Sequence, residues 1–305
     1  MSITVNRSEY DREFWNKAMR NKPSAYEVLS VGKASGGMFK LPYESDEKYT
    51  KALAQEGFFR SKANVIFVGE SESTIHIDDS DQVAEWVTPG GTISSVDGTD
   101  YLKKISVDCH KLVLLTRFNN DLVNDIHFPI EKHLVKKMAE GFGRAEENAF
   151  LNGTGVDEPT GILHESLGAE IGVTTSALTF DDVLRLYTSV KTKYRNKGIW
   201  VLNDDTALIL RTLKDADGNY LWNQNTDTIL GKPVFISEYM PDVVSGNKAI
   251  AFGDFSYYWI IDRKALAMRT LGENFAFNDE TGYLACEYLD GKLIRPEAIK
   301  VLQIS

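Results

Sequence analysis

A stretch of 32 residues, 69–100, constrains the fold more than any other part of the sequence. It contains eight acidic residues and neither lysine nor arginine. Two alternating segments, 74–77 and 83–87, lie inside it, and Pro89-Gly90-Gly91 is typical of a turn. The pattern predicts a long β-hairpin that is too polar to have a core of its own. Its Trp and its alternating Ile and Val residues favour an ordered extension that docks on a partner over a disordered loop.

The composition limits the class of protein. Of the 305 residues, 43% are hydrophobic and 26% are charged, as in ordinary globular proteins. This length allows one large domain or two, and folding needs neither disulfides nor metal. The net charge of −10 argues against a general binder of nucleic acid or of anionic membranes. The two cysteines, Cys109 and Cys286, suit a reducing cytoplasm, although the sequence does not exclude that they meet in space.

Neither a membrane span nor a secretory signal is expected. The longest uninterrupted apolar run has five residues, 257–261. A membrane-spanning helix needs about 20 apolar residues. The first 15 residues contain no apolar segment of the kind that a signal peptide requires.

Periodicity predicts the elements of the first half. The first 35 residues resemble an arm, with a helix begun by a capping box at Ser8 to Asp11 and a flexible, glycine-containing passage into the body. A short helix over 45–55 and a strand over 64–68 follow. A strand over 101–118 has an apolar face that shifts at Leu112, which indicates a bulge.

The strongest helical pattern spans residues 129–152. Pro129 suits the first turn, apolar residues recur at every fourth position from Ile130 to Phe142, and Asn152-Gly153 is typical of a helix end. At 1.5 Å per residue such a helix is roughly 35 Å long. Its narrow apolar stripe predicts a spine that lies across a sheet.

The second half predicts an α/β unit. Helices are expected over 180–190 and, after a cap at Asn203 or Asp204, as far as Leu213. Strands are expected at 199–202, 233–236, 249–252 and 257–261. Their uninterrupted hydrophobicity indicates strands that are covered on both faces. Residues 288–294 are predicted to form a hairpin turn, and 299–304 a final strand.

The sequence contains no recognisable catalytic motif. It has no dinucleotide, phosphate, zinc or serine-hydrolase signature, and its five histidines, His110 among them, show no ligand spacing. The glycine-rich segment 153–161 follows the end of a helix and carries Asp157 and Glu158, so it does not suit phosphate. Residues 215–219 lack the ligands of a calcium loop. We therefore predict no catalytic, cofactor-binding or metal-binding residues.

Several short motifs occur in order from Gly36 to near the end of the chain. The main ones are Gly36-Gly37 with Pro42, Ala84-Glu85-Trp86-Val87, the segments 145–155 and 158–163, Trp200 to Asp204, Gly218 to Trp222, Leu230 to Val234, and Ala251 to Phe255. Each motif is weak alone, but their order and spacing are specific. Together they resemble the major capsid proteins of tailed bacteriophages, which have the Hong Kong 97 shell fold.

The resemblance implies an α+β fold with the parts of a tailed-phage capsid protein. These are an N-terminal arm (1–35), a P-domain in two parts (36–68 and 105–178) with spine helix 129–152, an extended hairpin called the E-loop (69–104), an A-domain (179–282) and C-terminal strands that return to the body (283–305).

It also implies a structural function without catalysis or cofactors. Copies of the chain would form the pentamers and hexamers of an icosahedral shell, assembled in the host cytoplasm, that becomes the virion capsid. The shell would enclose double-stranded DNA without reading its sequence, and the negative charge would keep DNA from adhering. Further partners are a scaffolding protein, a portal and a maturation protease, and no membrane is involved. Two alternatives stay open, an encapsulin-type nanocompartment and an enzyme with an α/β domain.

The interface residues are predicted from two sources. Trp86 and Val87, with Ile75 and Ile77, are candidate contacts of the E-loop, because aromatic anchors dominate interfaces. Alternatively, Trp86 packs within its own hairpin. The family likeness alone places three further candidates near the A-domain centre, namely Trp222, Asn223 and Asn225.

Two features depart from some members of the family. Only about 35 residues precede Gly36, so a scaffold is either a separate protein, unnecessary or already removed. Some members link their subunits covalently through an E-loop lysine. Here Lys103 and Lys104 are at the expected base of the loop, so we predict no such link from its tip.

Overall fold

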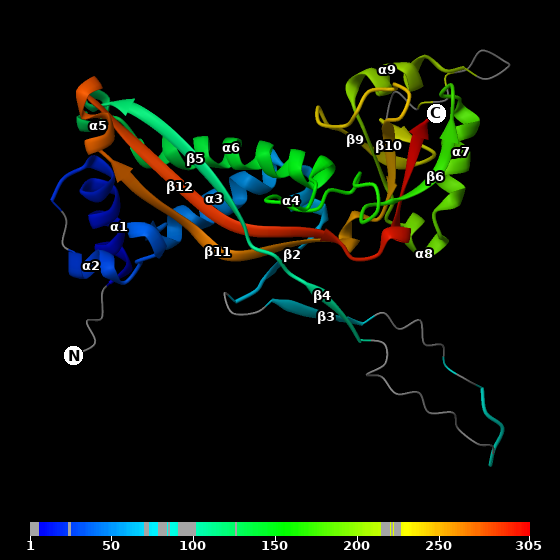
Figure 1. Ribbon diagram of the computed structural model, residues 1–305, viewed down its shortest axis with the longest axis horizontal. Coiled ribbons are helices and arrows are strands. Elements are labelled where there is room, and N and C mark those ends of the chain that lie inside the picture. Colours follow the sequence, from blue (N-terminus) through cyan, green and yellow to red (C-terminus); the bar gives the residue numbers. More distant parts are fainter. Residues whose placement is uncertain are drawn as a thin grey trace.

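The computed structural model describes the chain except for residues 1–5, 24–25, 70–72, 79–83, 85, 91–101, 126, 215–219, 221 and 223–226. The described part contains two separate sheets and a projecting hairpin (Figure 1). Its helices are α1 (Arg7–Asn16), α2 (Tyr26–Ser30), α3 (Tyr43–Glu56), α4 (Phe58–Lys62), α5 (Asn120–Asn124), α6 (Ile130–Asn152), α7 (Phe180–Ser189), α8 (Thr192–Arg195) and α9 (Asp204–Thr212). None of these helices combines the length and apolar character that crossing a membrane requires.

The first sheet has two long central strands covered by the spine helix. β11 (Tyr258–Leu271) and β12 (Glu280–Leu293) pair antiparallel, β5 (His110–Asn119) pairs with β12, and β1 (Phe39–Lys40) and β2 (Asn64–Phe67) both pair with β11. Helix α6 lies along this sheet (Figure 1). Its apolar stripe packs with α3 and with strand residues such as Met268 and Tyr283 in one core. The predicted spine helix is therefore confirmed, with its start one residue later because Pro129 precedes it.

The N-terminal segment packs on this body. Phe14, Trp15 and Met19 are buried in the same core as α6. The Tyr283 hydroxyl donates a hydrogen bond to the Met19 carbonyl at 2.7 Å. The predicted capping box is wrong, because α1 begins at Arg7, two residues earlier than a cap at Ser8 implies, and Asn6 caps it by accepting from the Ser8 amide. Helix α1 and the turn after it, expected in an arm, thus pack into the core of the body.

The second sheet is an α/β layer. Its strand order is β6 (Glu170–Thr175), β13 (Ile299–Ile304), β10 (Lys248–Gly253), β7 (Ile199–Leu202), β9 (Lys232–Ile236) and β8 (Thr228–Ile229). The central strands are buried on both faces, as their continuous hydrophobicity predicts, and α7 and α9 form where expected. Asn203 caps α9 through a hydrogen bond that its side chain accepts from the Thr206 amide at 2.8 Å.

Three sequence predictions differ from the observed strands. Residues 288–294 are not a hairpin turn but the end of the continuous strand β12. Residues 257–261, expected in the α/β unit, begin β11 and belong to the first sheet, whereas β13 belongs to the second. The strand predicted over 101–118 is interrupted at 107–109, where the chain passes from the hairpin to the first sheet, rather than bulged at Leu112.

Candidate functional site: the projecting hairpin and its base

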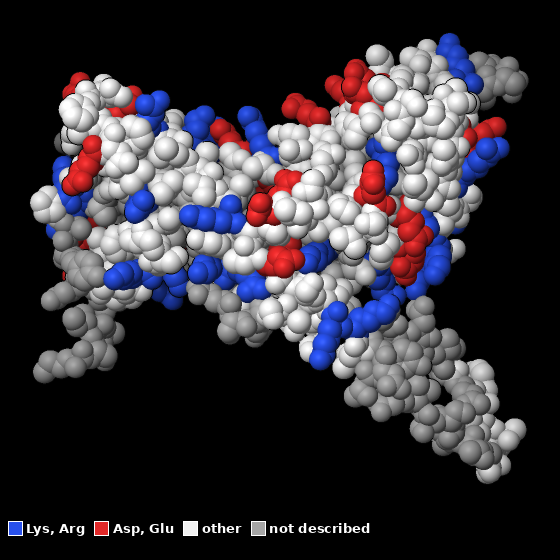
Figure 2. All heavy atoms as spheres, in the orientation of Figure 1, with Lys and Arg blue, Asp and Glu red and all other residues white. Residues whose placement is uncertain are grey.

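The third sheet consists of two strands that leave the body. β3 (Thr74–Asp78) and β4 (Leu102–Ser106) pair antiparallel, with Thr74 opposite Ser106 and Asp78 opposite Leu102. Residues 86–90 lie beyond them, far from both larger sheets (Figure 1). Figure 2 shows Lys and Arg side chains gathered along the edge of the body from which the hairpin departs. Because an isolated two-stranded hairpin is marginally stable in water, this one depends on its base or on a partner.

The hairpin has a small core at its base. Ile75 and Ile77 are each 9% exposed and pack with Val68, Val107 and Ile261 of the same chain. The expectation that the hairpin has no core is therefore wrong at its base. Both isoleucines, predicted as interface residues, already have intramolecular partners, so in the single chain they offer little surface to a neighbour.

The predicted aromatic anchor is exposed. Trp86 is fully exposed, at 101% of its reference surface, and Val87 is 39% exposed. Among the described residues of the hairpin none covers Trp86, which gives no support to the alternative that Trp86 packs within its own hairpin. Large apolar side chains displayed together usually mark an interaction site. The interface role of these two residues stays a prediction that their exposure supports.

One arginine holds both ends of the hairpin to the first sheet. Arg263, on β11 and only 5% exposed, donates hydrogen bonds to the carbonyl oxygens of Val107 at 3.0 Å and Asp108 at 3.1 Å, which follow β4. It also reaches the Gly69 carbonyl, which precedes β3, at 3.5 Å. A guanidinium carries five donors in a fixed plane, which suits it to several backbone acceptors at once. Arg263 therefore fixes the direction in which the hairpin leaves the body.

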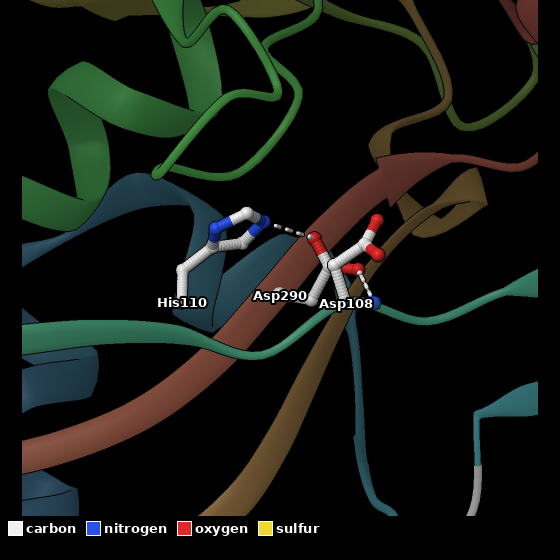
Figure 3. A group of neighbouring side chains, drawn as sticks. All are labelled: Asp108, His110 and Asp290. Atoms are coloured by element: carbon white, nitrogen blue, oxygen red, sulfur yellow. Dashed lines mark hydrogen bonds and ion pairs between the residues drawn. The ribbon is translucent and has the colours of Figure 1, made fainter.

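A cluster of charged residues lies beside this arginine. The buried Asp290 carboxylate accepts a hydrogen bond from the Asp108 amide at 2.8 Å, and the His110 ring points toward it with Nε2 3.6 Å from Oδ1 (Figure 3). Lys292 donates to Asp108 Oδ2 at 2.7 Å and to the Ser106 carbonyl at 2.9 Å. The cluster thus connects residues 107–109, which lie between β4 and β5, to strand β12.

This cluster also resembles a metal-ligand set. The candidate ligand atoms of Asp108, His110 and Asp290 lie within 4.8 Å of one another. However, the Lys292 ammonium lies 2.7 Å from Asp108 and 3.5 Å from Asp290, so the two carboxylates already have a cation between them. We interpret the cluster as structural. The sequence did not predict it, because Asp108 and His110 are far along the chain from Asp290 on β12, and Asp290-Gly291 has the composition of a turn.

The ion pair of Asp108 predicts a small, pH-dependent contribution to stability. The hydrogen bond from Lys292 lowers the pKa of Asp108 below its ordinary value. A carboxyl with a lowered folded-state pKa stabilises the fold above its unfolded pKa, and this contribution is lost as the pH falls through the folded-state pKa. We expect Asp108→Asn to cost at most about 1 kcal/mol at pH 7, because the side chain is 56% exposed. In urea unfolding, the difference from the wild type should shrink as the pH falls below the ordinary pKa of aspartate and through the lowered folded-state pKa; a difference that does not change with pH would contradict this.

Of the second predicted group, Trp222 packs in the core of the α/β layer. Trp222 is 2% exposed, its indole nitrogen donates to Asp227 Oδ1 at 2.9 Å, and the Arg211 guanidinium lies 4.9 Å from the centre of its ring. Its side chain therefore packs within the chain. Asn223 and Asn225 are outside the described residues, so their predicted role is untested.

A buried charge network that the sequence did not reveal joins the spine helix to the first sheet. Arg60 on α4 donates to Glu146 on α6, with Nε 2.8 Å from Oε2, and to Asp262 on β11, with Nη1 2.6 Å from Oδ2. Each carboxylate receives two hydrogen bonds from the guanidinium. The Arg60 and Glu146 side chains are only 10% and 2% exposed. The one sequence signal was that Glu146 lies four residues after Phe142, on the apolar face of the helix.

Glu287 on β12 adds a third carboxyl group to this network. Burial, with the nearby charge of Glu146, raises the pKa of Glu287 well above its ordinary value. The Tyr49 hydroxyl donates to Glu287 Oε2 at 2.8 Å. The raised pKa favours the protonated form of Glu287, which avoids a third anion beside the single guanidinium. These contacts connect α3, α4, α6, β11 and β12.

Comparison with known proteins gives a consistent result. The phage capsid family matches residues 37–304 of this chain. The capsid of an empty GTA particle is 30% identical, with a TM-score of 0.67, over 84% of this chain and 90% of that one. The Gordonia phage Cozz structure is 14% identical with a TM-score of 0.55, over 82% and 87% of the two chains.

A third solved structure extends the likeness in fold. The procapsid of satellite phage P4, which includes a size determination protein, has a TM-score of 0.58 at 10% identity, over 84% of this chain and 98% of that one. None of the curated proteins matches the chain in sequence. The family match nonetheless covers most of the chain, and the α+β architecture predicted from the motifs agrees with these structures. The chain therefore belongs to the phage capsid family.

Proposed function

We propose that this chain is the major capsid protein of a tailed bacteriophage or prophage. Its copies assemble through pentamers and hexamers into an icosahedral shell that encloses double-stranded DNA. The observation that carries the proposal is the projecting hairpin. Its strands β3 and β4 leave a body that has complete cores of its own, and Trp86 beyond these strands is fully exposed. An element of this kind gains its apolar burial from another molecule.

The domains are proposed to correspond to those of the family. We assign the first sheet with α6 to the P-domain, the hairpin over 69–104 to the E-loop, and the second sheet with α7 and α9 to the A-domain. Sheet membership supports three changes to the boundaries expected from the sequence, with 258–282 in the P-domain and both 170–175 and 299–304 in the A-domain. The arm over 1–35 is then in large part a docked element of the P-domain.

The partners and the location follow from this function. The main partner is the chain itself, and a scaffolding protein, a portal and a maturation protease are proposed for assembly, which takes place in the host cytoplasm before the chain joins the virion capsid. DNA is enclosed without recognition of its sequence. The encapsulin alternative is not favoured, because the solved structures named above come from GTA and phage particles. The role is structural, which also disfavours the enzyme alternative.

The proposal is tested by the particle mass of the expressed chain. After gel filtration, light scattering should show species far heavier than the 34.2 kDa subunit, and negative-stain images of that peak should show closed shells or rings of five and six. If the chain elutes as a monomer, co-expression with the genes beside its own decides. Monomers there as well would contradict the proposal.

No covalent link from the hairpin tip is expected between the subunits of assembled particles. Residues 69–100 contain no lysine, and Lys103 and Lys104 lie on β4, paired with Ile77 and His76 at the base of the hairpin. Particles boiled in SDS with reductant should therefore give one band at the subunit mass. A ladder of multiples that persists in reductant, and whose peptides map to residues 69–104, would show that the prediction is wrong.

A further inference from the structure

The buried charge network between the spine helix and the first sheet has more carboxyl groups than cations. The guanidinium of Arg60 donates four hydrogen bonds, and all four end on the carboxylates of Glu146 and Asp262. Glu287, which is only 6% exposed, receives none of them. An ionised Glu287 would therefore be a buried anion without a hydrogen-bonded cation, and a buried charge of that kind is strongly unfavourable.

The two carboxyl oxygens of Glu287 have different surroundings. Oε2 accepts a hydrogen bond from the Tyr49 hydroxyl at 2.8 Å. Oε1 is buried, and among the described residues no donor reaches it. Buried polar atoms nearly always have a hydrogen-bond partner. A proton on Oε1 makes this oxygen a donor, and an acceptor is in place, because the side chains of Glu287 and Glu146 are within hydrogen-bonding reach of each other.

The groups around Glu287 act on its charge in opposite directions. Burial first, and then the negative charge of Glu146, raise the pKa of Glu287 well above its ordinary value, and the smaller effect of Arg60 lowers it. On β5 the residue opposite Glu287 is the uncharged Leu112. The titratable and charged side chains near Glu287 are Tyr49 on α3, Arg60 on α4, Glu146 on α6 and Asp262 on β11, with Asp46 and Lys264 on the wall of the adjoining cavity of about 380 Å³.

We propose that Glu287 and Glu146 share one proton, and that release of this proton at alkaline pH loosens the contact between the spine helix and the first sheet. Release transfers the proton from Glu287 to hydroxide, which becomes water, and leaves two anions side by side in a buried site. Two carboxyl groups in one site resist ionising together because their charges repel. The repulsion acts between α6 and β12, which carry the two side chains. This device lies within the body of one chain and does not depend on the proposed shell function.

The direction of the pH effect follows from the raised pKa. Folded Glu287 keeps its proton at pH values where an unfolded glutamate has released it, so folding takes up one proton in this range. The stabilisation is complete below the unfolded pKa and is lost as the pH rises through the folded-state pKa. Between the two values the equilibrium constant for unfolding should increase about tenfold for each pH unit. Tyr49 remains a donor here, because burial raises its pKa well above the ordinary value.

Glu287→Gln in the full-length chain tests the effect on stability. The amide has the shape of a protonated carboxyl group and can donate to Glu146 while it accepts from Tyr49, but it does not titrate. In urea unfolding from about pH 5 to 8, the unfolding constant of the wild type should rise about tenfold per pH unit relative to this variant. The matched control is Glu56→Gln, at an exposed glutamate on α3, and should keep the wild-type pH dependence.

Infrared difference spectra test the shared proton without unfolding the protein, in subunits or in particles. At neutral pH the wild type should show the band of a protonated carboxylic acid, which Glu287→Gln lacks and Glu56→Gln retains. In Glu146→Gln this band should disappear at a lower pH, because the charge of Glu146 helps to hold the proton. No such band in the wild type, an unchanged titration in Glu146→Gln, or parallel pH dependence of the wild type and Glu287→Gln would each overturn the proposal.

Discussion

A chain in which Asn-Gly replaces residues 79–101 is expected to fold and stay in solution but to form no closed shells. The replacement joins Asp78 to Leu102, which face each other at the last pair of the hairpin, and Asn-Gly is a favoured two-residue turn between antiparallel strands. It keeps Ile75 and Ile77, so the small core at the base remains intact. It removes Trp86 and Val87, the exposed residues of the hairpin that are predicted to contact a neighbour.

This replacement separates a loss of assembly from a loss of folding better than a deletion chosen from the sequence alone. Removing 72–98 would also remove β3, expose Val68, Val107 and Ile261, and confuse loss of assembly with loss of folding. The measurement is particle formation by light scattering and electron microscopy, with the urea midpoint of unfolding as the folding control. Trp86→Ala in the full-length chain is the matched smaller change and should weaken assembly without abolishing it. Shells of normal size from the shortened chain would show that the hairpin is dispensable.

The largest expected loss of stability comes from Arg60→Met. The substitution keeps an unbranched side chain of similar length but leaves Glu146, which is 2% exposed, without the guanidinium that gives it two hydrogen bonds. Breaking a buried ion pair from one side costs about 3–5 kcal/mol. Whole domains are stable by only about 5–15 kcal/mol, so the variant should unfold at a much lower urea concentration.

A double substitution separates the charge from the packing. Arg60→Met combined with Glu146→Gln removes both charges, and we expect it to recover most of the lost stability. Arg60→Lys keeps the charge but cannot form the paired hydrogen bonds, so its free energy of unfolding should lie between those of the wild type and Arg60→Met. If the free energy of unfolding of Arg60→Met lies within about 0.5 kcal/mol of the wild-type value, as for a typical surface substitution, the network is not what joins α6 to the sheet.

The elements that the sequence predicted best are those with a strong local pattern. The apolar residues at every fourth position from Ile130 to Phe142, with Pro129 before them, predicted the spine helix to within one residue of its observed start. The continuous apolar run 199–202 gave a central strand of the second sheet. Each of these signals is fixed by neighbours along the chain, and the packing of the fold agrees with it.

The failures occur where tertiary contacts override local preference. Asp290-Gly291 has the composition of a turn, yet the Asp290 carboxylate accepts the amide of Asp108, and a Cβ at Gly291 would lie 2.4 Å from the Tyr258 hydroxyl. The glycine therefore serves close packing in a continuous strand. The N-terminal helix was predicted to belong to an arm, because no short sequence pattern shows that Phe14 and Trp15 pack in one core with α6.

The candidate site was only partly predictable for the same reason. The acidity of 69–100 could be inferred from composition, and the hairpin strands from alternation, whereas the exposure of Trp86 was only one of two open alternatives. The hydrogen bonds of Arg263 could not be inferred, because Arg263 on β11 is 194 positions from Gly69 and 156 from Val107.

An electron cryomicroscopy map of assembled particles tests the central claim most directly. The account predicts a closed shell of five- and six-membered rings in which every hairpin leaves its own subunit at Arg263 and crosses to a neighbour, with Trp86 covered by that neighbour. A map in which the hairpin folds back on its own subunit, or in which Trp86 remains in solvent within a closed shell, would contradict it.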